Sequence, residues 1–137
     1  MKVALWIAQA LLALAFLAAG AMKLTQPMEA LATAMAWTTA VPEALVRLIG
    51  AAEILGALGL VLPAATRILP RLTPLAAALL AVVMLLASAF HLTRGEAAMV
   101  PINLILIALL AFVAWGRTAR APIAPRGAGA STRQQTA

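Results

Sequence analysis

Four long apolar runs alternate with short polar segments along the 137 residues of the chain. A helix of about 19 residues rises roughly 28 Å, close to the ~30 Å hydrocarbon thickness of a bilayer. The pattern therefore predicts an all-α, polytopic membrane protein built as a four-transmembrane-helix bundle. The runs cover residues 3–22, 44–62, 74–92 and a fourth that starts at Met99 or Pro101 and ends at Trp115.

Local signals set the ends of these runs. Pro42 and Glu43 mark the start of the second helix, and Pro63 predicts its end. The fourth run is short for a full span unless its helix extends toward Arg117. The first run has the small residues of a signal-peptide cleavage site, but its 20 residues exceed the usual ~7–15 of such segments. We expect it to be a retained transmembrane helix.

The connection between the first two spans is too polar to cross a membrane and too apolar for free coil. Met28, Leu31 and Met35 recur at helical spacing after Pro27, which predicts a short interfacial helix between helices one and two. An equally good interpretation of this spacing alone is a hydrophobic loop that only closes the connection.

Composition strengthens the membrane assignment. Hydrophobic residues are 65% of the chain and charged residues 10%, against about 25% charged residues in soluble domains, and the mean hydropathy is +1.05. The net charge of +6 does not indicate nucleic-acid binding, because the basic residues gather on one side of the predicted membrane. The positive-inside rule then places both termini in the cytoplasm of a multi-pass cell-membrane protein. The residues on that side are Lys2, Arg67, Arg71, Arg117, Arg120, Arg126 and Arg133, against Lys23, Arg47 and Arg94 on the other.

The chain divides into two parts. Residues 1–117 are predicted to form the transmembrane domain, and residues 118–137 a disordered basic cytoplasmic tail, because the tail has no apolar period. Without cysteine the chain forms no disulfide, iron–sulfur ligation or c-type haem attachment, and its one histidine excludes bis-histidine haem ligation within one chain. No metal, flavin or nucleotide motif is present, so the chain holds no redox centre of its own.

Glu53 is the most informative residue. It lies nine residues after Ala44, roughly 14 Å into the second span by helical rise, where a charge costs on the order of 2.5–3.5 kcal/mol and normally faces the bundle interior. Gly50, Gly56 and Gly59 continue its spacing of three residues and predict a helix-packing stripe that turns Glu53 toward other helices.

Three further polar residues are candidates for the same buried site: Lys23 at the end of span one, His91 near the outer end of span three, beside Ser88, and Asn103 in span four. One interpretation is a cavity with Glu53 at its floor and His91 near its mouth. The other is a hydrogen bond or ion pair from Glu53 to Lys23 or Asn103 that only fixes helix register. Gln9 lies toward the inner side and is predicted to bond across helices separately, while Arg47 is expected to pair with Glu43 one turn earlier.

The segments "FLAAGAMKL", "VPEALVRLIGAAEILGALGLVLP", "ASAFHLTRGE" and the final "AWGR" resemble the DoxX-like family of small four-helix membrane proteins over about residues 3–117. The matching positions are Gly20 and Lys23, then Gly50, Glu53 and Gly56, then His91. The resemblance implies proximity to quinone-linked redox chemistry and a partner redox subunit, since some relatives are small subunits of a thiosulfate:quinone oxidoreductase and others associate with enzymes of thiol and superoxide defence.

Three functions follow as hypotheses. The first is a membrane anchor or quinone-pocket subunit of a redox assembly, with Glu53 and His91 near a quinone carbonyl and no enzyme activity by the chain alone. The second is a transporter for protons or a small molecule, and the third a purely structural membrane protein. The stripe of glycines serves contacts within or between chains equally well, so it leaves the oligomeric state open.

Overall fold

The structure is a computed structural model that describes residues 1–127, and within that range every regular element is helical. Four segments are long and apolar enough to cross a membrane, which confirms the predicted four-helix, all-α class. Two short helices follow α1 before the second span. The elements are α1 (Lys2–Thr25), α2 (Met28–Ala34), the 3-10 helix η1 (Ala36–Ala40), α3 (Glu43–Thr66), α4 (Leu72–Thr93), the 3-10 helix η2 (Ala97–Met99), α5 (Val100–Trp115) and the π-helical turn η3 (Gly116–Arg120).

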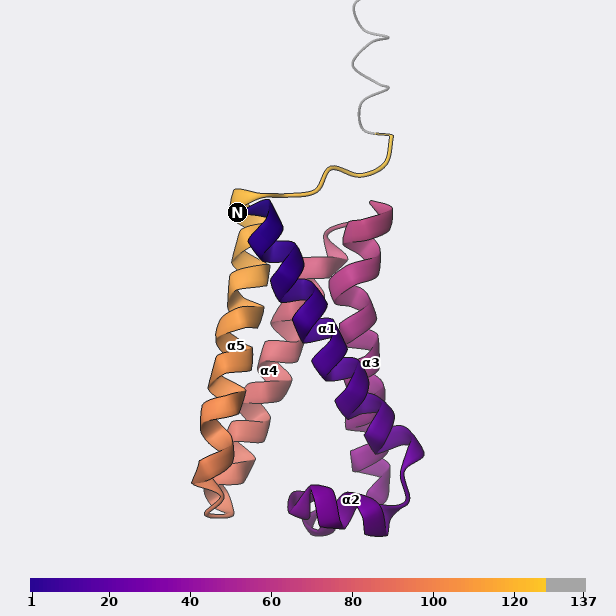
Figure 1. The fold of residues 1–137 in the computed structure, drawn as a ribbon, viewed down its shortest axis with the longest axis vertical. Helices are drawn as coiled ribbons and strands as arrows, with labels where there is room; N and C mark the ends of the chain where they lie inside the picture. The colour runs from indigo at the N-terminus through magenta and orange to yellow at the C-terminus, as the bar shows by residue number, and fades with distance from the viewer. Residues whose placement is uncertain (128–137) are drawn as a thin grey trace, which may run out of the picture.

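The four long helices run up and down, so the N-terminus and the end of η3 lie at one end of the bundle and α2 at the other (Figure 1). We call these the terminal end and the α2 end. Helix α1 packs mainly on α3, and α4 packs mainly on α5. Helix α1 also runs obliquely, from beside the end of α5 at the terminal end to beside α3 at the α2 end (Figure 1). This oblique path lets α1 meet different helices at its two ends.

The core is a column of apolar side chains between the four helices. Leu12, Leu60, Leu80 and Leu110 are fully or almost fully buried, one from each long helix. Large apolar residues also cover the outer surface, for example Leu14 and Leu86, each 66% exposed. In water such a surface would be unstable, whereas against lipid tails it is the expected outer face of a membrane bundle.

Two helix boundaries differ from the sequence-based expectation. Helix α3 continues through Pro63 to Thr66, so the prediction that Pro63 ends the span was wrong. Proline lacks an N–H and its ring crowds the carbonyl four residues earlier, but transmembrane helices tolerate it where neighbouring groups satisfy the freed carbonyl. Arg67 ends α3 instead, in a left-handed conformation with φ 60°. At the other end of the chain, the fourth span extends beyond Trp115 through the π-helical turn η3 to Arg120.

The predicted short helix after Pro27 is present as α2. Its Leu31 is fully buried, as is Thr38 in η1, so this connection packs onto the bundle rather than forming a free loop. At the terminal end, residues 118–127 make contacts where a disordered tail was expected. The N–H of Ala121 donates to the Gly116 carbonyl at 2.7 Å, and the N–H of Arg126 to the Arg67 carbonyl at 3.0 Å. Residues 128–137 of the expected tail lie outside the described residues.

Candidate functional site

Lys23 and Glu53 form a buried ion pair between α1 and α3. The Lys23 Nζ donates to both carboxylate oxygens, at 2.9 Å to Oε1 and 2.7 Å to Oε2. Lys23 is 5% exposed and Glu53 3% exposed. Of the two partners suggested by the sequence, the structure therefore gives Glu53 the lysine and not Asn103. The pair is neutral as a unit. It joins two helices through residues that are 30 positions apart in sequence.

Glycine makes this contact possible. A Cβ on Gly20 would lie 2.7 Å from the Gly50 carbonyl oxygen, and one on Gly50 would lie 2.8 Å from the Lys23 Cβ. Neither position leaves space for a side chain, so α1 and α3 approach backbone to backbone. This level is five residues before the end of α1 at Thr25, about 8 Å by helical rise.

The predicted stripe of glycines divides between two neighbours. Gly50 faces α1, whereas a Cβ on Gly56 would meet the Leu80 side chain at 2.6 Å and one on Gly59 the Ala76 Cβ at 2.8 Å, both on α4. Each step of three residues turns a helix about 60° short of a full revolution, so Gly59 lies about 180° around α3 from Gly50. The prediction that the glycines share one helix face was therefore wrong. Helix α3 uses them to contact helices on opposite sides.

Arg47 fastens α3 to the end of α1. Its guanidinium pairs with Glu43 at 2.9 Å, as the spacing predicted. It also donates to the Lys23 carbonyl and, at 2.9 Å, to the Gln26 carbonyl. These carbonyls belong to the C-terminal turn of α1, where unpaired oxygens and the helix dipole favour a cation. Arg47 thus holds the backbone from which the Lys23 side chain projects.

Trp37 in η1 covers the same end. Lys23 Nζ lies 6.0 Å from the centre of the Trp37 ring, and the ring of Phe90 on α4 meets Trp37 edge to face at 6.5 Å. The segment between α1 and α3 therefore links the ion pair to α4. A lysine already bonded to a carboxylate gains further stabilisation from an aromatic face.

His91 belongs to a second cluster at the α2 end. Its Nδ1 lies 2.7 Å from Glu96 Oε2, and Arg94 Nε donates to Glu96 Oε1 at 2.8 Å. With Glu96 ionised, His91 Nδ1 carries the proton and donates it. The hydrogen bond from His91, followed by the hydrogen bond and charge of Arg94, lowers the pKa of Glu96 below its ordinary value of 4.5. The sequence did not predict that Glu96 would be the partner of His91.

Ser88 and Asn103 are two further buried polar residues of this end. The Ser88 hydroxyl donates to the Met84 carbonyl of its own helix at 2.8 Å. Asn103 is 9% exposed, and its Nδ2 is buried without a hydrogen-bond partner among residues 1–127. A buried amide donor without a partner costs on the order of 1–3 kcal/mol, so it marks a position where a ligand acceptor would be favourable.

A different polar cluster lies at the terminal end. The sequence predicted its hydrogen bond from Gln9 to another helix but not the participation of Arg117. Gln9 Nε2 donates across the bundle to the Leu60 carbonyl of α3, as predicted. Gln9 Oε1 also accepts a 2.7 Å hydrogen bond from Arg117 Nε. Arg117, counted among the basic residues that mark the cytoplasmic side, is 6% exposed and lies 4.9 Å from the centre of the Trp6 ring. The only signal was that Gln9 and Arg117 fall toward the same predicted side of the membrane.

Two cavities in the described part of the chain lie elsewhere. One, of about 350 Å³, is an apolar groove between α1 and α3, lined by residues such as Ala13 and Leu58. The other, of about 980 Å³, lies between α4 and α5 at the terminal end. Neither is lined by Glu53 or His91. Residues 1–127 contain no group of three or more His, Asp or Glu side chains placed to bind a metal ion.

Four apolar helices with buried polar links define an integral membrane protein of the small four-helix type. The model of the DoxX-like family matches residues 7–113, which cover all four long helices almost completely. The chain belongs to the DoxX-like family. No curated protein and no solved structure matches it.

Proposed function

We propose that this protein is the membrane anchor of a redox-linked assembly and that its α2 end holds a quinone headgroup. Family membership supports the membrane role. The observation that carries the quinone site is the buried Asn103 Nδ2, which has no partner within the described residues. A quinone carbonyl oxygen is an acceptor of the kind that this amide lacks.

The residues of this end suit such a group. Asn103 would donate to a carbonyl oxygen, and His91 Nε2, opposite the nitrogen that contacts Glu96, would hold or accept a proton. A bound quinone would supply two-electron redox chemistry that no side chain of this protein provides. Glu96 fixes the orientation of the His91 ring, and Phe90, whose ring meets both Trp37 and His91 edge to face, packs beside it.

The direct test is quinone binding by the purified protein in detergent. Asn103→Leu keeps the side-chain size and removes the donor, so it is expected to weaken binding at least about fivefold, in line with the loss of one buried hydrogen bond. Ser88→Ala is the matched control, because the Ser88 hydroxyl is satisfied within its own helix. Equal affinity of both variants, or no binding by the unaltered protein, rejects the quinone site.

A partner subunit is tested separately. The protein is expressed with an affinity tag at its natural level, extracted in mild detergent and isolated, and co-isolated proteins are identified by mass spectrometry. We expect an oxidoreductase subunit that carries the flavin, haem or metal centre absent from this sequence. Recovery of the chain alone under several detergents would reject the anchor role while leaving quinone binding as an independent result.

The second candidate function is purely structural, and the bidentate Lys23–Glu53 pair favours it. Both carboxylate oxygens are used by one ammonium group, so the pair as it stands offers no free acceptor to a ligand. Under this alternative Glu53→Gln lowers stability and leaves quinone affinity and cellular phenotype unchanged. A loss of quinone affinity in a Glu53→Gln protein that keeps its fold would favour the quinone site.

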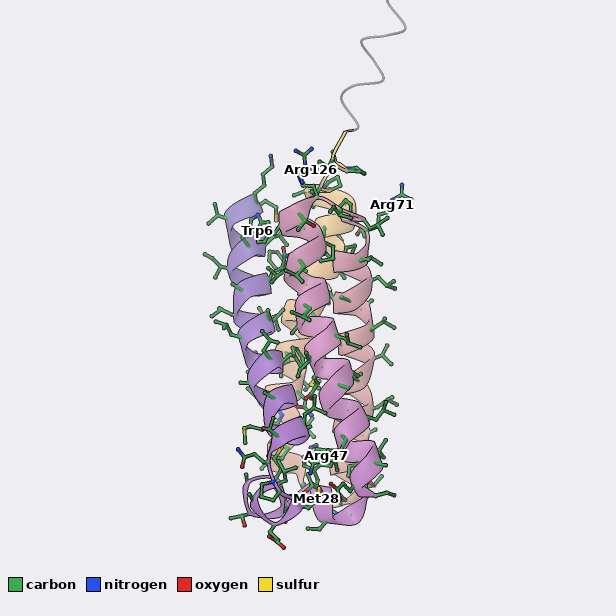
Figure 2. All side chains as sticks on the ribbon, turned by 90° about the vertical axis from the view of Figure 1, so that its right-hand side faces the viewer. Trp6, Met28, Arg47, Arg71 and Arg126 are labelled. Atoms are coloured by element: carbon green, nitrogen blue, oxygen red, sulfur yellow. The ribbon has the colours of Figure 1, made fainter. Side chains whose placement is uncertain are left out.

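We further propose that both termini face the cytoplasm of the cell membrane. In support, the terminal end carries Arg71 and Arg126 together with Trp6, whereas Arg47 and Met28 lie at the opposite end (Figure 2). A basic excess on one side is the usual signature of the cytoplasmic face. Reporter fusions after residues 25 and 127 should give opposite locations, and a periplasmic or external signal from the fusion after residue 127 would reverse the orientation.

A further inference from the structure

The larger cavity lies where α4 begins and α5 ends, at the terminal end. It has a volume of about 980 Å³ and combines apolar walls, such as Leu75, Ala78 and Trp115, with the basic residues Arg71 and Arg117. Leu75 and Trp115 are 51% and 45% exposed on the outer surface of the bundle. The cavity is therefore continuous with a surface that faces lipid tails.

Arg117 is the unusual member of this cavity. It is 6% exposed, and its hydrogen-bond partner is the neutral side-chain amide of Gln9. Its Nη2 has no hydrogen-bond partner among residues 1–127. A buried guanidinium normally lies beside an anion, because burial without one leaves its charge uncompensated.

The protein supplies no carboxylate side chain for this purpose. The sequence has four acidic residues, Glu29, Glu43, Glu53 and Glu96. All four belong to the α2 half of the bundle, and three of them pair with Lys23, Arg47 or His91. None of these four carboxylates can therefore balance the charge of Arg117, and another anionic group is needed.

Two further features make the cavity favourable for an anion. The first turn of the 22-residue helix α4 contributes Pro74 and Leu75 to its wall, and the N-terminus of a helix carries partial positive charge. The exposed Arg71 at the N-cap adds a second cation at the rim. The cavity is thus positive at its polar end and apolar along its membrane side.

The C-terminal segment closes the cavity from the terminal end. Pro122, Ile123 and Pro125 line it, and Arg67 Nε donates to the Ala124 carbonyl at 3.0 Å. The Arg126 N–H returns a bond to the Arg67 carbonyl at 3.0 Å. These contacts hold the segment beside the loop between α3 and α4.

We propose that this cavity binds the phosphate headgroup of an anionic phospholipid, with the phosphate near Arg117 and Arg71 and the acyl chains along Leu75, Ala78 and Trp115. A lipid fits better than a soluble phosphate because the apolar wall needs an amphiphile to cover it. The apolar groove between α1 and α3 provides an internal comparison. Its lining is entirely Ala, Leu and Val, so any lipid in it is held without preference for headgroup charge.

The test uses the full-length protein, freed of lipid in a neutral detergent and titrated with dioleoylphosphatidylglycerol or dioleoylphosphatidylcholine. Bound lipid is counted by native mass spectrometry. We expect one site that prefers phosphatidylglycerol at least about fivefold, as one charge-assisted hydrogen bond would give. Equal affinity for the two lipids overturns the proposal.

Two variants and a control locate the site. Arg117→Gln should abolish the preference, whereas Lys2→Gln removes a charge from the same end outside the cavity and should retain it. Ala78→Phe is the second test, for the case in which Arg117→Gln does not fold. It leaves Arg117 and its bond to Gln9 intact and fills the apolar wall with a larger side chain, so it should weaken phosphatidylglycerol binding. Unchanged phosphatidylglycerol affinity in the Ala78→Phe protein contradicts the proposal.

A competition arm separates the lipid from a soluble anion. Inorganic phosphate at millimolar concentration should leave phosphatidylglycerol bound, because it cannot replace the acyl-chain contacts. Displacement of the lipid by inorganic phosphate alone would identify a soluble-anion site and overturn the assignment to a phospholipid.

Discussion

The two ends of the bundle bury polar groups in different ways. At the α2 end, the Lys23 ammonium and the Glu53 carboxylate neutralise each other across α1 and α3. At the terminal end, the partners of the Arg117 guanidinium among residues 1–127 are the Gln9 amide and the Trp6 ring. Both clusters connect α1 to other helices at comparable burial. The difference is that, within the described part of the chain, the α2 end balances its buried charge and the terminal end does not.

This difference separates two tasks of buried polar groups in membranes. A neutral, fully bonded pair fixes the register of two helices, because any slip would leave two charges without partners. An arginine without a carboxylate creates a positive position that attracts an anion. We therefore expect the α2 end to respond to substitutions mainly through stability, and the terminal end to respond to the lipid around it.

The largest effect should come from breaking the ion pair on one side only. Lys23→Met leaves the Glu53 carboxylate buried without its cation and should lower the free energy of unfolding by about 3–5 kcal/mol. The double variant Lys23→Met with Glu53→Leu removes both charges and should recover most of that loss. Unfolding in detergent micelles titrated with dodecyl sulfate measures both. With Glu53→Leu alone as the second single variant, losses that simply add in the double variant would show that the two side chains act independently.

The close approach of α1 and α3 should give the second largest effect. In Gly20→Val the new side chain meets the Gly50 carbonyl, a backbone atom that cannot rotate away, so about 1–3 kcal/mol should be lost. Ala18→Val adds a similar volume to the exposed side of α1 and serves as the control. The same unfolding titration applies, and similar values for the two variants would argue against a tight contact at Gly20.

The terminal end gives a smaller and more revealing response. Gln9→Leu removes the acceptor of Arg117 and the donor to Leu60, which should cost about 1–2 kcal/mol. Gln9→Glu supplies Arg117 with a carboxylate and should be more stable than Gln9→Leu, since it makes this end resemble the α2 end. If Gln9→Glu is less stable than Gln9→Leu, this result would show that the charge of Arg117 is already compensated in the unaltered protein.

The smallest effect concerns pH at Glu96, outside the membrane spans. Because the folded-state pKa of this carboxyl lies below its ordinary value of 4.5, its contacts stabilise the turn between α4 and η2 above that pH. This stabilisation should be lost as the pH falls through the lowered folded-state pKa. Hydrogen exchange of residues 91–99 between pH 7 and pH 3, corrected for the intrinsic exchange rate, should show the loss. Glu96→Gln should remove this pH dependence, and an unchanged profile in that variant would exclude Glu96 as its origin.

The sequence was sufficient for the architecture. Four runs of bilayer length fixed the spans to within a few residues, and the spacing of Met28 and Leu31 located α2. It failed at Pro63, because a transmembrane helix tolerates a proline that usually signals a helix end. It also treated Gly50 and Gly59 as one face, although a spacing of three residues turns steadily around a helix.

For the polar residues, the sequence determined that Glu53 and Gln9 must face other helices, because a bilayer core offers no water to solvate them. It could not determine their partners. The oblique path of α1 decided that Lys23 meets Glu53, that Arg117 meets Gln9, and that Asn103 meets neither. Such pairings depend on how the helices cross. The crossing is set by all of the contacts between the helices together, so it cannot be predicted from the sequence of any one segment.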